Sequence, residues 1–349
     1  MRILITFLIL LLFNQKVYAA GVDEFIEKYF SPFSDSFSSF IFTPVEIFGA
    51  EVPILIFFMI AASIFCTFYF RGIAIWGFKH SLKQIFHKKD TTNQDHLGEV
   101  SSIGALATAL SGTVGLGNIA GVAIAISIGG PGAMFWMCIG AIFGMALKFC
   151  EVTLSLKYRR FNSDGSVSGG PMFYIERGFA RKGYHSLGKT LSYVYALAFL
   201  PATVGGGCML QTNQAARQFI IITGGDNSFF ALHSWVFGLL TAIVVALVIV
   251  GGIKSIANVT SKIVPVMCLL YAGTCIIIIA VNFMHIPDAI CTILHEAFFP
   301  KAVAGGIIGT IIIGLRRSIQ SNEAGIGSSP IAYAAVKTDE PASQGFVSM

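Results

Sequence analysis

The sequence predicts an all-α integral membrane protein, and two observations lead to that fold class. Of the 349 residues, 55% are hydrophobic and 12% are charged, whereas an ordinary globular domain carries about 25% charged residues. The charged residues also gather in short stretches, such as 79–95 and 158–189, with apolar segments between them. A bilayer imposes this spacing, because about 20 apolar residues in a helix cross its hydrocarbon core. The composition therefore excludes a soluble enzyme.

The first fifty residues do not form a membrane span in our interpretation. Residues 1–19 resemble a signal peptide, since Arg2 precedes a short apolar run and a small-residue cleavage site follows Ala19. An uncleaved anchor is the alternative that this pattern leaves open. Residues 20–50 are rich in phenylalanine but interrupted by prolines, so we expect an external or interfacial segment.

The first predicted span lies within residues 51–78 and sets the orientation of the chain. It covers residues 52–70, and the basic cluster that follows is assigned to the cytoplasm by the positive-inside rule. We therefore expect a multi-pass protein of the inner (plasma) membrane with an external mature N-terminus. Later basic clusters fall on the same predicted side. The further predicted spans are residues 101–128, 133–156, 191–219, 232–250, 263–283 and 302–336.

Two of these spans contain an internal interruption rich in glycine and polar residues. One lies at residues 111–118 and the other at residues 321–330. Each glycine in a helix interior costs about 1 kcal/mol relative to alanine. Non-helical backbone at bilayer depth persists where it lines a cavity or packs within protein. We therefore expect two broken helices.

The two interruptions share one pattern, Gly115-Leu116-Gly117-Asn118 in the first and Gly325-Ile326-Gly327-Ser328 in the second. The first broken helix is predicted to run outward and the second inward. An antiparallel pair of broken helices is typical of inverted-repeat transporters, whose substrate and ion sites lie between the breaks. Packing of small residues between helices is the alternative for such glycines, but it leaves the clustered polar residues unexplained.

A broken helix exposes backbone groups that can bind ions. The N-terminal end of a half-helix attracts a carboxylate, while free carbonyls at the opposing end suit sodium. We assign the sodium ligands to the backbone carbonyls of Gly112 and Val114. Side chains at the same depth have hydrogen-bonding groups that suit a small amino acid; these are Thr113, Asn118, Asn322 and Ser328.

Three further polar residues lie inside predicted spans, where such groups need a partner or a cavity. Gln211 has either a pocket role or a hydrogen bond to another helix. Glu151 is a functional candidate that could instead pair with a loop cation. Glu323 lies inside the second interruption, where it could tether the broken helix or coordinate an ion.

Other classes of protein are disfavoured. A net charge of +5 could suggest nucleic acid, but the basic residues lie in loops between apolar spans, so we expect no nucleic-acid partner. The chain has no P-loop and no HExxH motif, and we expect no organic cofactor and no enzymatic activity. A membrane-embedded enzyme is the weaker alternative, because no acid, base and nucleophile share one depth.

The motifs resemble those of the alanine or glycine:cation symporter (sodium:alanine symporter) family. The resemblance begins with the runs 112–123 and 129–137 and covers the chain from about residue 52 onward. It extends to Lys148-Phe149-Cys150-Glu151, Gly169-Gly170-Pro171-Met172, Gln211-Thr212-Asn213, Gly251-Gly252-Ile253-Lys254 and Ser321-Asn322-Glu323-Ala324-Gly325-Ile326-Gly327-Ser328.

The resemblance implies sodium-coupled uptake of alanine or glycine by alternating access, on the inverted-repeat (leucine-transporter-type) helix bundle. Residues 51–78 are then an extra transmembrane helix, residues 100–283 the first five-helix repeat, and residues 302–337 the first, broken helix of the second repeat. The substrate-binding residues carried over are Thr113, Gly115, Gly117, Asn118, Gln211, Asn322, Gly325, Gly327 and Ser328.

The chain departs from the family pattern in two places. Before Ser321 the family usually has Lys-Arg-Gly with an aromatic or aliphatic pair. This chain instead has Leu-Arg-Arg-Ser-Ile-Gln at residues 315–320. Family members also continue for several spans beyond the segment that matches residues 344–346, so we expect residues 338–349 to be a truncated tail and the second repeat to be incomplete. The alternative function is therefore a non-transporting remnant, or a half that needs a separate C-terminal partner.

Overall fold

The computed structural model describes residues 28–29, 31–41, 43–47, 50–86, 98–300 and 306–349. The expected signal peptide, residues 1–19, lies outside the described residues. The chain forms two compact units, residues 1–58 and residues 59–349.

The first unit contains a helix and a β-hairpin. Helix α3 spans Ser31–Ile41, and strands β1 (Pro44–Ile47) and β2 (Ala50–Pro53) pair antiparallel. Helix α4 spans Ile54–Tyr69 and begins directly after β2. The expected helix of residues 51–78 is therefore shorter, because residues 51–53 complete the hairpin and α4 ends before Arg71, which has a positive φ of 53°.

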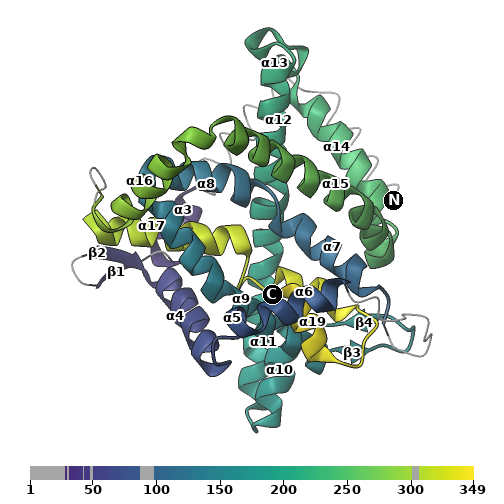
Figure 1. The fold of residues 1–349 in the computed structure, drawn as a ribbon. Helices are drawn as coiled ribbons and strands as arrows, with labels where there is room; N and C mark the ends of the chain where they lie inside the picture. Colours follow the sequence, from purple (N-terminus) through teal and green to yellow (C-terminus); the bar gives the residue numbers. More distant parts are fainter. Residues whose placement is uncertain (1–27, 30, 42, 48–49, 87–97, 301–305) are drawn as a thin grey trace. The chain divides into compact units, whose positions relative to one another are not determined.

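The second unit is a bundle of helices (Figure 1). Its α-helices are α5 (Ile73–Trp76), α6 (Phe78–Phe86), α7 (Ser102–Thr113), α8 (Leu116–Gly129), α9 (Gly132–Tyr158), α10 (Pro171–Arg181), α11 (His185–Ala202), α12 (Leu210–Ile222), α13 (Phe229–Leu232), α14 (Ser234–Ile249), α15 (Gly252–Val281), α16 (Ile286–Phe298), α17 (Gly306–Asn322), α18 (Ser328–Ala334) and α19 (Pro341–Ser348). The π-helix η2 (Thr203–Met209) joins α11 to α12, and β3 (Arg160–Phe161) pairs with β4 (Val167–Ser168).

Within the part of the chain that the structure describes, four helical segments are long and apolar enough to cross a membrane. They are Ser102–Gly129, Gly132–Tyr158, His185–Ile222 and Gly252–Val281. Two shorter apolar helices, α4 and α14, match two further predicted spans. Six of the seven predicted spans thus have an apolar helix, which is the pattern of a multi-pass membrane protein. The seventh predicted span, residues 302–336, is instead divided into α17 and α18.

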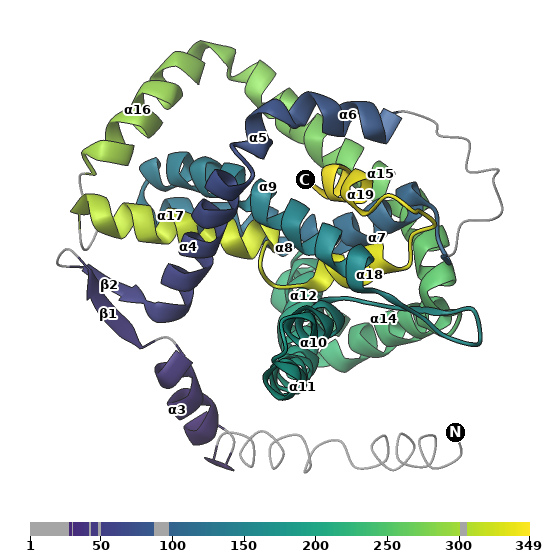
Figure 2. The same ribbon diagram turned by 90° about the horizontal axis from the view of Figure 1, so that it is seen from below.

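The structure also contains helices that the sequence did not predict. Helix α15 begins at Gly252, whereas the predicted span began only at residue 263, after Lys262. The helix includes both Lys254 and Lys262, which the apolar pattern left outside the span. Helix α16 is amphipathic, and its polar residues interrupt the continuous apolar run that predicts a span. The segment 338–349, expected to be a tail, contains α19, which packs against α9 and α6 (Figure 2).

Helices α9 and α17 pack closely through small residues, and Figure 2 shows them side by side. A Cβ atom on Gly140 would lie 2.8 Å from the Ser318 side chain, and a Cβ atom on Gly314 would lie 2.6 Å from the backbone of Ala133. Real Cβ atoms do not come this close to other atoms, so glycine is required at both positions. Small residues therefore allow close helix packing at this interface, at glycines outside the two interruptions.

Candidate functional site

The first broken helix is interrupted at the predicted position. Helix α7 ends at Thr113 and α8 begins at Leu116, so the first break consists of Val114 and Gly115 in extended conformations. The Asn118 Oδ1 atom accepts a hydrogen bond of 3.4 Å from the Gly115 N–H group. The last carbonyls of an α-helix have no partner within the helix, so the end of α7 offers free oxygen ligands.

The second broken helix is also interrupted as predicted. Helix α17 ends at Asn322 and α18 begins at Ser328, so the second break consists of residues 323–327. Glu323, Gly325 and Gly327 have φ values of 53°, 87° and 92°. A left-handed conformation costs a residue with a side chain roughly 1–2 kcal/mol, and Glu323 therefore adopts a strained backbone inside the predicted site.

The two breaks lie against each other. A Cβ atom on Gly117, in the first turn of α8, would lie 3.1 Å from the Gln320 carbonyl oxygen and 3.1 Å from the Ser321 Cα atom. A Cβ atom on Gly112, in the last turn of α7, would lie 3.6 Å from Glu323 Oε2. Both ends of the first break therefore face the second broken helix.

The two broken helices run in opposite directions. Val100, just before α7, forms a β-bridge with Val336, just after α18. The start of α7 thus lies beside the end of α18, while the start of α8 lies beside the end of α17. This antiparallel arrangement is the one expected from the sequence for the pair of broken helices.

Gln211 reaches the first break from α12. Its Oε1 atom lies 3.6 Å from the Cβ position of Gly115. Gln211 is exposed, and it is not among the residues that line the cavity beside the breaks. Helix α12 follows the π-helix η2, and π-helical turns occur frequently at functional sites.

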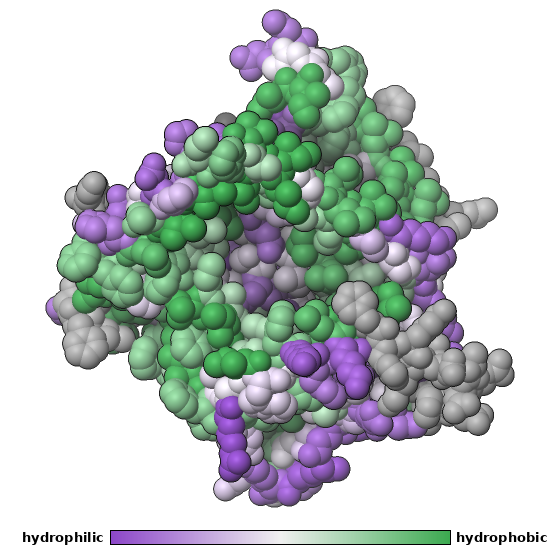
Figure 3. All heavy atoms as spheres, in the orientation of Figure 1, coloured by the Kyte–Doolittle hydropathy of each residue, from purple (hydrophilic) through white to green (hydrophobic). Residues whose placement is uncertain are grey.

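A cavity of about 240 Å³ opens next to the two breaks. Glu323 contributes a carboxylate to it, and Ser328 Oγ donates a hydrogen bond of 2.7 Å to Glu323 Oε2. Figure 3 separately shows hydrophilic atoms at the floor of a hollow with a hydrophobic rim, which lies between α7, α8 and α9 in Figure 1. The lining residues are Thr108, Ala109, Gly112, Phe199, Ile253, Glu323, Ser328, Ser329, Ile331 and Ala332.

Two predicted binding side chains have local partners instead. Thr113 Oγ1 donates a hydrogen bond of 3.0 Å to the Ala109 carbonyl within α7. Asn322 Oδ1 accepts one of 2.9 Å from the Ala324 N–H group, and its Nδ2 atom packs against Gly144 of α9. The Asn322 side chain therefore faces α9 and not the first break.

Polar residues of α9 contact the second broken helix, and sequence reasoning identified only Glu151 among them. Lys148 Nζ donates a hydrogen bond of 3.0 Å to the Asn322 carbonyl, and Ser155 Oγ donates one of 2.7 Å to the Pro330 carbonyl. The Glu151 carboxylate faces the Gly325 N–H group. The sequence pattern that could have identified them is the spacing of three and four residues between Lys148, Glu151 and Ser155, which places these polar side chains on one face of an apolar helix.

The end of this polar series is Arg159, just beyond α9. Its guanidinium donates hydrogen bonds to the carbonyls of Ala334 (3.0 Å), Val336 (2.5 Å) and Thr338 (2.6 Å). Burial lowers the pKa of Arg159, and the nearby Asp339 carboxylate opposes that shift. Arginine nevertheless stays charged at neutral pH, so the chain after α18 is held by a half-buried cation.

The Gly169-Gly170-Pro171 motif packs against α18 and the second break. A Cβ atom on Gly169 would collide with Ala334, and one on Gly327 would collide with Pro171 and with the Tyr195 hydroxyl. The Tyr195 hydroxyl also donates a hydrogen bond of 3.0 Å to the Ile326 carbonyl. The motif thus permits close contact between α10 and the second broken helix.

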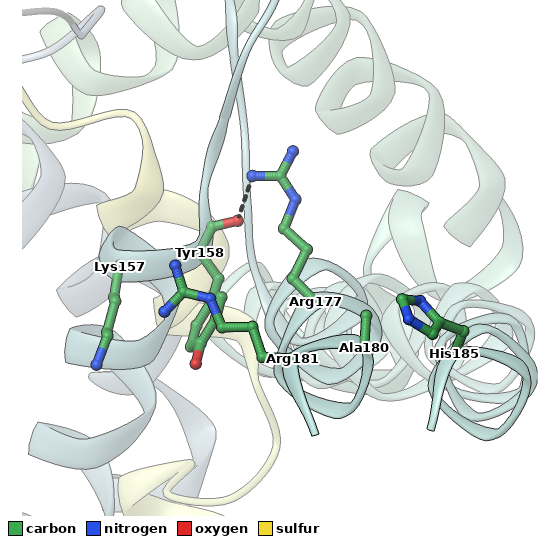
Figure 4. A pocket seen from close by; sticks show the side chains of 6 residues that line it. All are labelled: Lys157, Tyr158, Arg177, Ala180, Arg181 and His185. Carbon is green, nitrogen blue, oxygen red and sulfur yellow. Dashed lines mark hydrogen bonds between the residues drawn. The ribbon is translucent and has the colours of Figure 1, made fainter. Parts of the chain in front are cut away.

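A second cavity, of about 390 Å³, lies where α9 ends and α10 meets α11. Figure 4 shows Arg177 directed to the Tyr158 carbonyl, at 3.1 Å, and Arg181 beside the Tyr158 ring. The cavity is lined by Lys157, Tyr158, Arg177, Ala180, Arg181 and His185. None of these residues belongs to either break.

The chain resembles several curated transporters, of which three are described. The sodium/alanine symporter AgcS of Methanococcus maripaludis is 42% identical over 85% of this chain and 63% of the relative. An uncharacterized transporter of Haemophilus influenzae is 40% identical over 88% of this chain and 65% of the relative. The amino-acid carrier protein AlsT of Bacillus subtilis is 37% identical over 71% of this chain and 50% of the relative.

The chain therefore spans less than two thirds of the length of these relatives. Residues 36–349 match the model of the sodium:alanine symporter family. That match reaches the last residue and gives no support to the expected truncation. On the extent of this match and the identity to AgcS, the chain belongs to the sodium:alanine symporter family.

Proposed function

We propose that the protein couples the uptake of a small neutral amino acid, alanine or glycine, to the inward movement of sodium. The observation that carries this proposal is the contact between the two breaks, with Gly117 against Gln320 and Gly112 against Glu323. Broken helices that meet in this way are where secondary transporters bind substrate and ion. The family and the name of the AgcS relative support the same assignment.

Sodium binds at the end of α7 in this proposal. The backbone carbonyls of Gly112 and Val114 supply hard oxygen ligands, and the C-terminal end of a helix carries partial negative charge. The Glu323 carboxylate faces Gly112 and adds a full negative charge beside that end. The carboxylate and the negative end of α7 repel each other, so a cation bound between them stabilises the arrangement.

The amino acid binds next to the ion. Its carboxylate faces the start of α8, where Gly117 and Asn118 lie in the first turn and the helix dipole favours an anion. Gln211 lies within reach of the same break, and Ser328, Gly325 and Gly327 line the opposite side. The cavity of about 240 Å³ then serves as the path along which the small substrate leaves.

Transport proceeds by alternating access around the two breaks. In this proposal α7–α8 and α17–α18 are the equivalent first helices of two inverted repeats of the leucine-transporter type, and their antiparallel contact supports that relation. By the positive-inside rule we assign the basic ends of α9 and α10 to the cytoplasm and the N-terminus to the outside, and the membrane in this proposal is the inner membrane.

The test is uptake of labelled alanine by the full-length protein in proteoliposomes. We expect accumulation when sodium is higher outside and none when potassium replaces it. Labelled glycine, serine and D-alanine, added in turn, define the substrate range. Sodium-independent uptake would contradict the coupling, and absence of uptake for all four amino acids would contradict the substrate class.

A further inference from the structure

Helix α9 carries a continuous polar stripe in an otherwise apolar span. Lys148, Glu151 and Ser155 follow at intervals of three and four residues and therefore lie on one face of the helix, and Arg159 follows four residues later, just beyond its end. Lys148, Ser155 and Arg159 donate hydrogen bonds to the second broken helix or to the chain directly after it, and Glu151 faces the Gly325 N–H group. The stripe thus follows this helix from the end of α17, across the break, to the end of α18.

Two members of the stripe lie at the break and carry opposite charges. Lys148 is 8% exposed, and its Nζ donates to the Asn322 carbonyl, where α17 ends. Glu151 is 7% exposed and faces the Gly325 N–H group inside the break. A cation at a helix C-terminus and an anion facing free N–H groups both match the helix dipole. The positive charge of Lys148 thus lies at the carbonyl end of α17, and the negative charge of Glu151 lies beside an N–H group of the break.

This arrangement keeps two charges buried in an apolar helix, which costs free energy unless each is paired. Glu151 has one oxygen, Oε2, that is buried without a hydrogen-bond partner among the described residues. A pair that served stability alone would gain more from an apolar replacement of both residues. The retained cost indicates a role in the conformation of the break.

We propose that Lys148 and Glu151 are positioning residues that hold the second break in the geometry that binds the amino acid. Lys148 fixes the carbonyl end of α17, and Glu151 orients the Gly325 N–H group. Neither side chain has to touch the substrate. The inference rests on the proposed function, since it concerns the same site.

The test measures KM and Vmax for labelled alanine in proteoliposomes, normalised to the amount of reconstituted protein, for Lys148→Met and Glu151→Gln. We expect KM to rise about tenfold or more in each variant, because the break no longer holds the binding geometry, and tenfold corresponds to about 1.4 kcal/mol. Lys148→Arg keeps the charge and the donors, so its KM should stay near that of the wild type.

Two controls separate positioning from stability. Ser155→Ala removes a buried hydrogen bond of the same stripe, to Pro330 outside the break, and should leave KM unchanged even if less protein folds. The double variant Lys148→Met/Glu151→Gln leaves no unpaired charge, so it should fold and still show the raised KM.

The outcomes are distinguishable. A wild-type KM in the double variant, with or without a lower Vmax, would overturn the positioning role while leaving the transport function intact. If the wild-type protein itself takes up no labelled amino acid, the proposed function fails and this inference fails with it.

Discussion

The two broken helices share a sequence pattern but differ in what surrounds their breaks. At the first break, the nearest side chain to the Cβ position of Gly115 is the uncharged Gln211. At the second break, α9 contributes Lys148 and Glu151, and α11 contributes Tyr195. The backbone of the first break is bonded locally, since the Val114 N–H group donates to the Leu110 carbonyl, and the Gly115 N–H and carbonyl groups bond to Asn118. The second break is contacted by side chains of α9 and α11. The same Gly-apolar-Gly pattern is thus supported by its own helix in one case and by neighbouring helices in the other.

The largest effect is expected at Gly327, where close packing and a φ of 92° coincide. In Gly327→Ala the new methyl group would meet Tyr195 and Pro171. The left-handed backbone adds about 1–2 kcal/mol and the overpacking about 1–3 kcal/mol, so we expect strong destabilisation and background uptake. The melting temperature in detergent checks this.

The matched control for this change is Gly238→Ala in α14, where the new methyl group meets open space. Its melting temperature should equal that of the wild type. A wild-type melting temperature for Gly327→Ala would show that the second break is not tightly packed and would remove the contrast between the two breaks.

The second largest effect is expected for Glu323→Gln. This variant keeps the shape of the side chain but removes the negative charge that faces Gly112. Hydrogen bonds to charged groups contribute about 1.5–3 kcal/mol, so uptake at limiting sodium should fall by about tenfold or more. The measurement is the sodium concentration that gives half-maximal uptake.

The control is Glu176→Gln, since Glu176 is an exposed carboxylate on α10. Its sodium dependence should equal that of the wild type. Should Glu323→Gln also retain wild-type sodium dependence, Glu323 would only tether Ser328 and the ion would bind elsewhere.

An intermediate effect is expected for Gly117→Ala. Its methyl group would lie 3.1 Å from the backbone of Gln320 and would push the two broken helices apart. Overpacking of this kind costs about 1–3 kcal/mol, so KM for alanine should rise about fivefold or more. The partner variant Gly115→Ala meets Gln211 at an ordinary 3.6 Å and should change KM less. The reverse order would mean that the breaks do not depend on this contact.

The smallest effect is expected for Gln211→Ala, which removes one polar side chain from the first break. One hydrogen bond contributes about 0.5–1.5 kcal/mol, so KM should rise about twofold to tenfold with Vmax retained. Asn213→Ala, on the same helix, is the control. Equal KM values for the two variants and the wild type would place Gln211 outside the binding site.

The positions of both breaks could be predicted from the sequence because their cause is local. Gly112, Gly115 and Gly117, together with Asn118, disfavour a continuous helix whatever surrounds them, and α7 does end at Thr113. The contact of the two breaks was also expected, since antiparallel broken helices meet in known inverted-repeat transporters.

The supporting residues could not be predicted, because their roles depend on packing between distant segments. Asn322 was expected to bind substrate, but its side chain packs against Gly144, which lies 178 positions earlier (322 − 144). Lys148 gives no local sign that it contacts the end of α17. Helix α19 was missed because eight residues of mixed polarity carry too weak a pattern to predict a helix.

The most direct test of the shared site is equilibrium binding of labelled alanine to the purified full-length protein, with and without sodium, for the wild type and for Glu323→Gln. If sodium and the amino acid bind between the two breaks, sodium should tighten alanine binding to the wild type and have little effect on Glu323→Gln. Alanine binding that is independent of sodium in the wild type, or equally tightened by sodium in both proteins, would contradict the account.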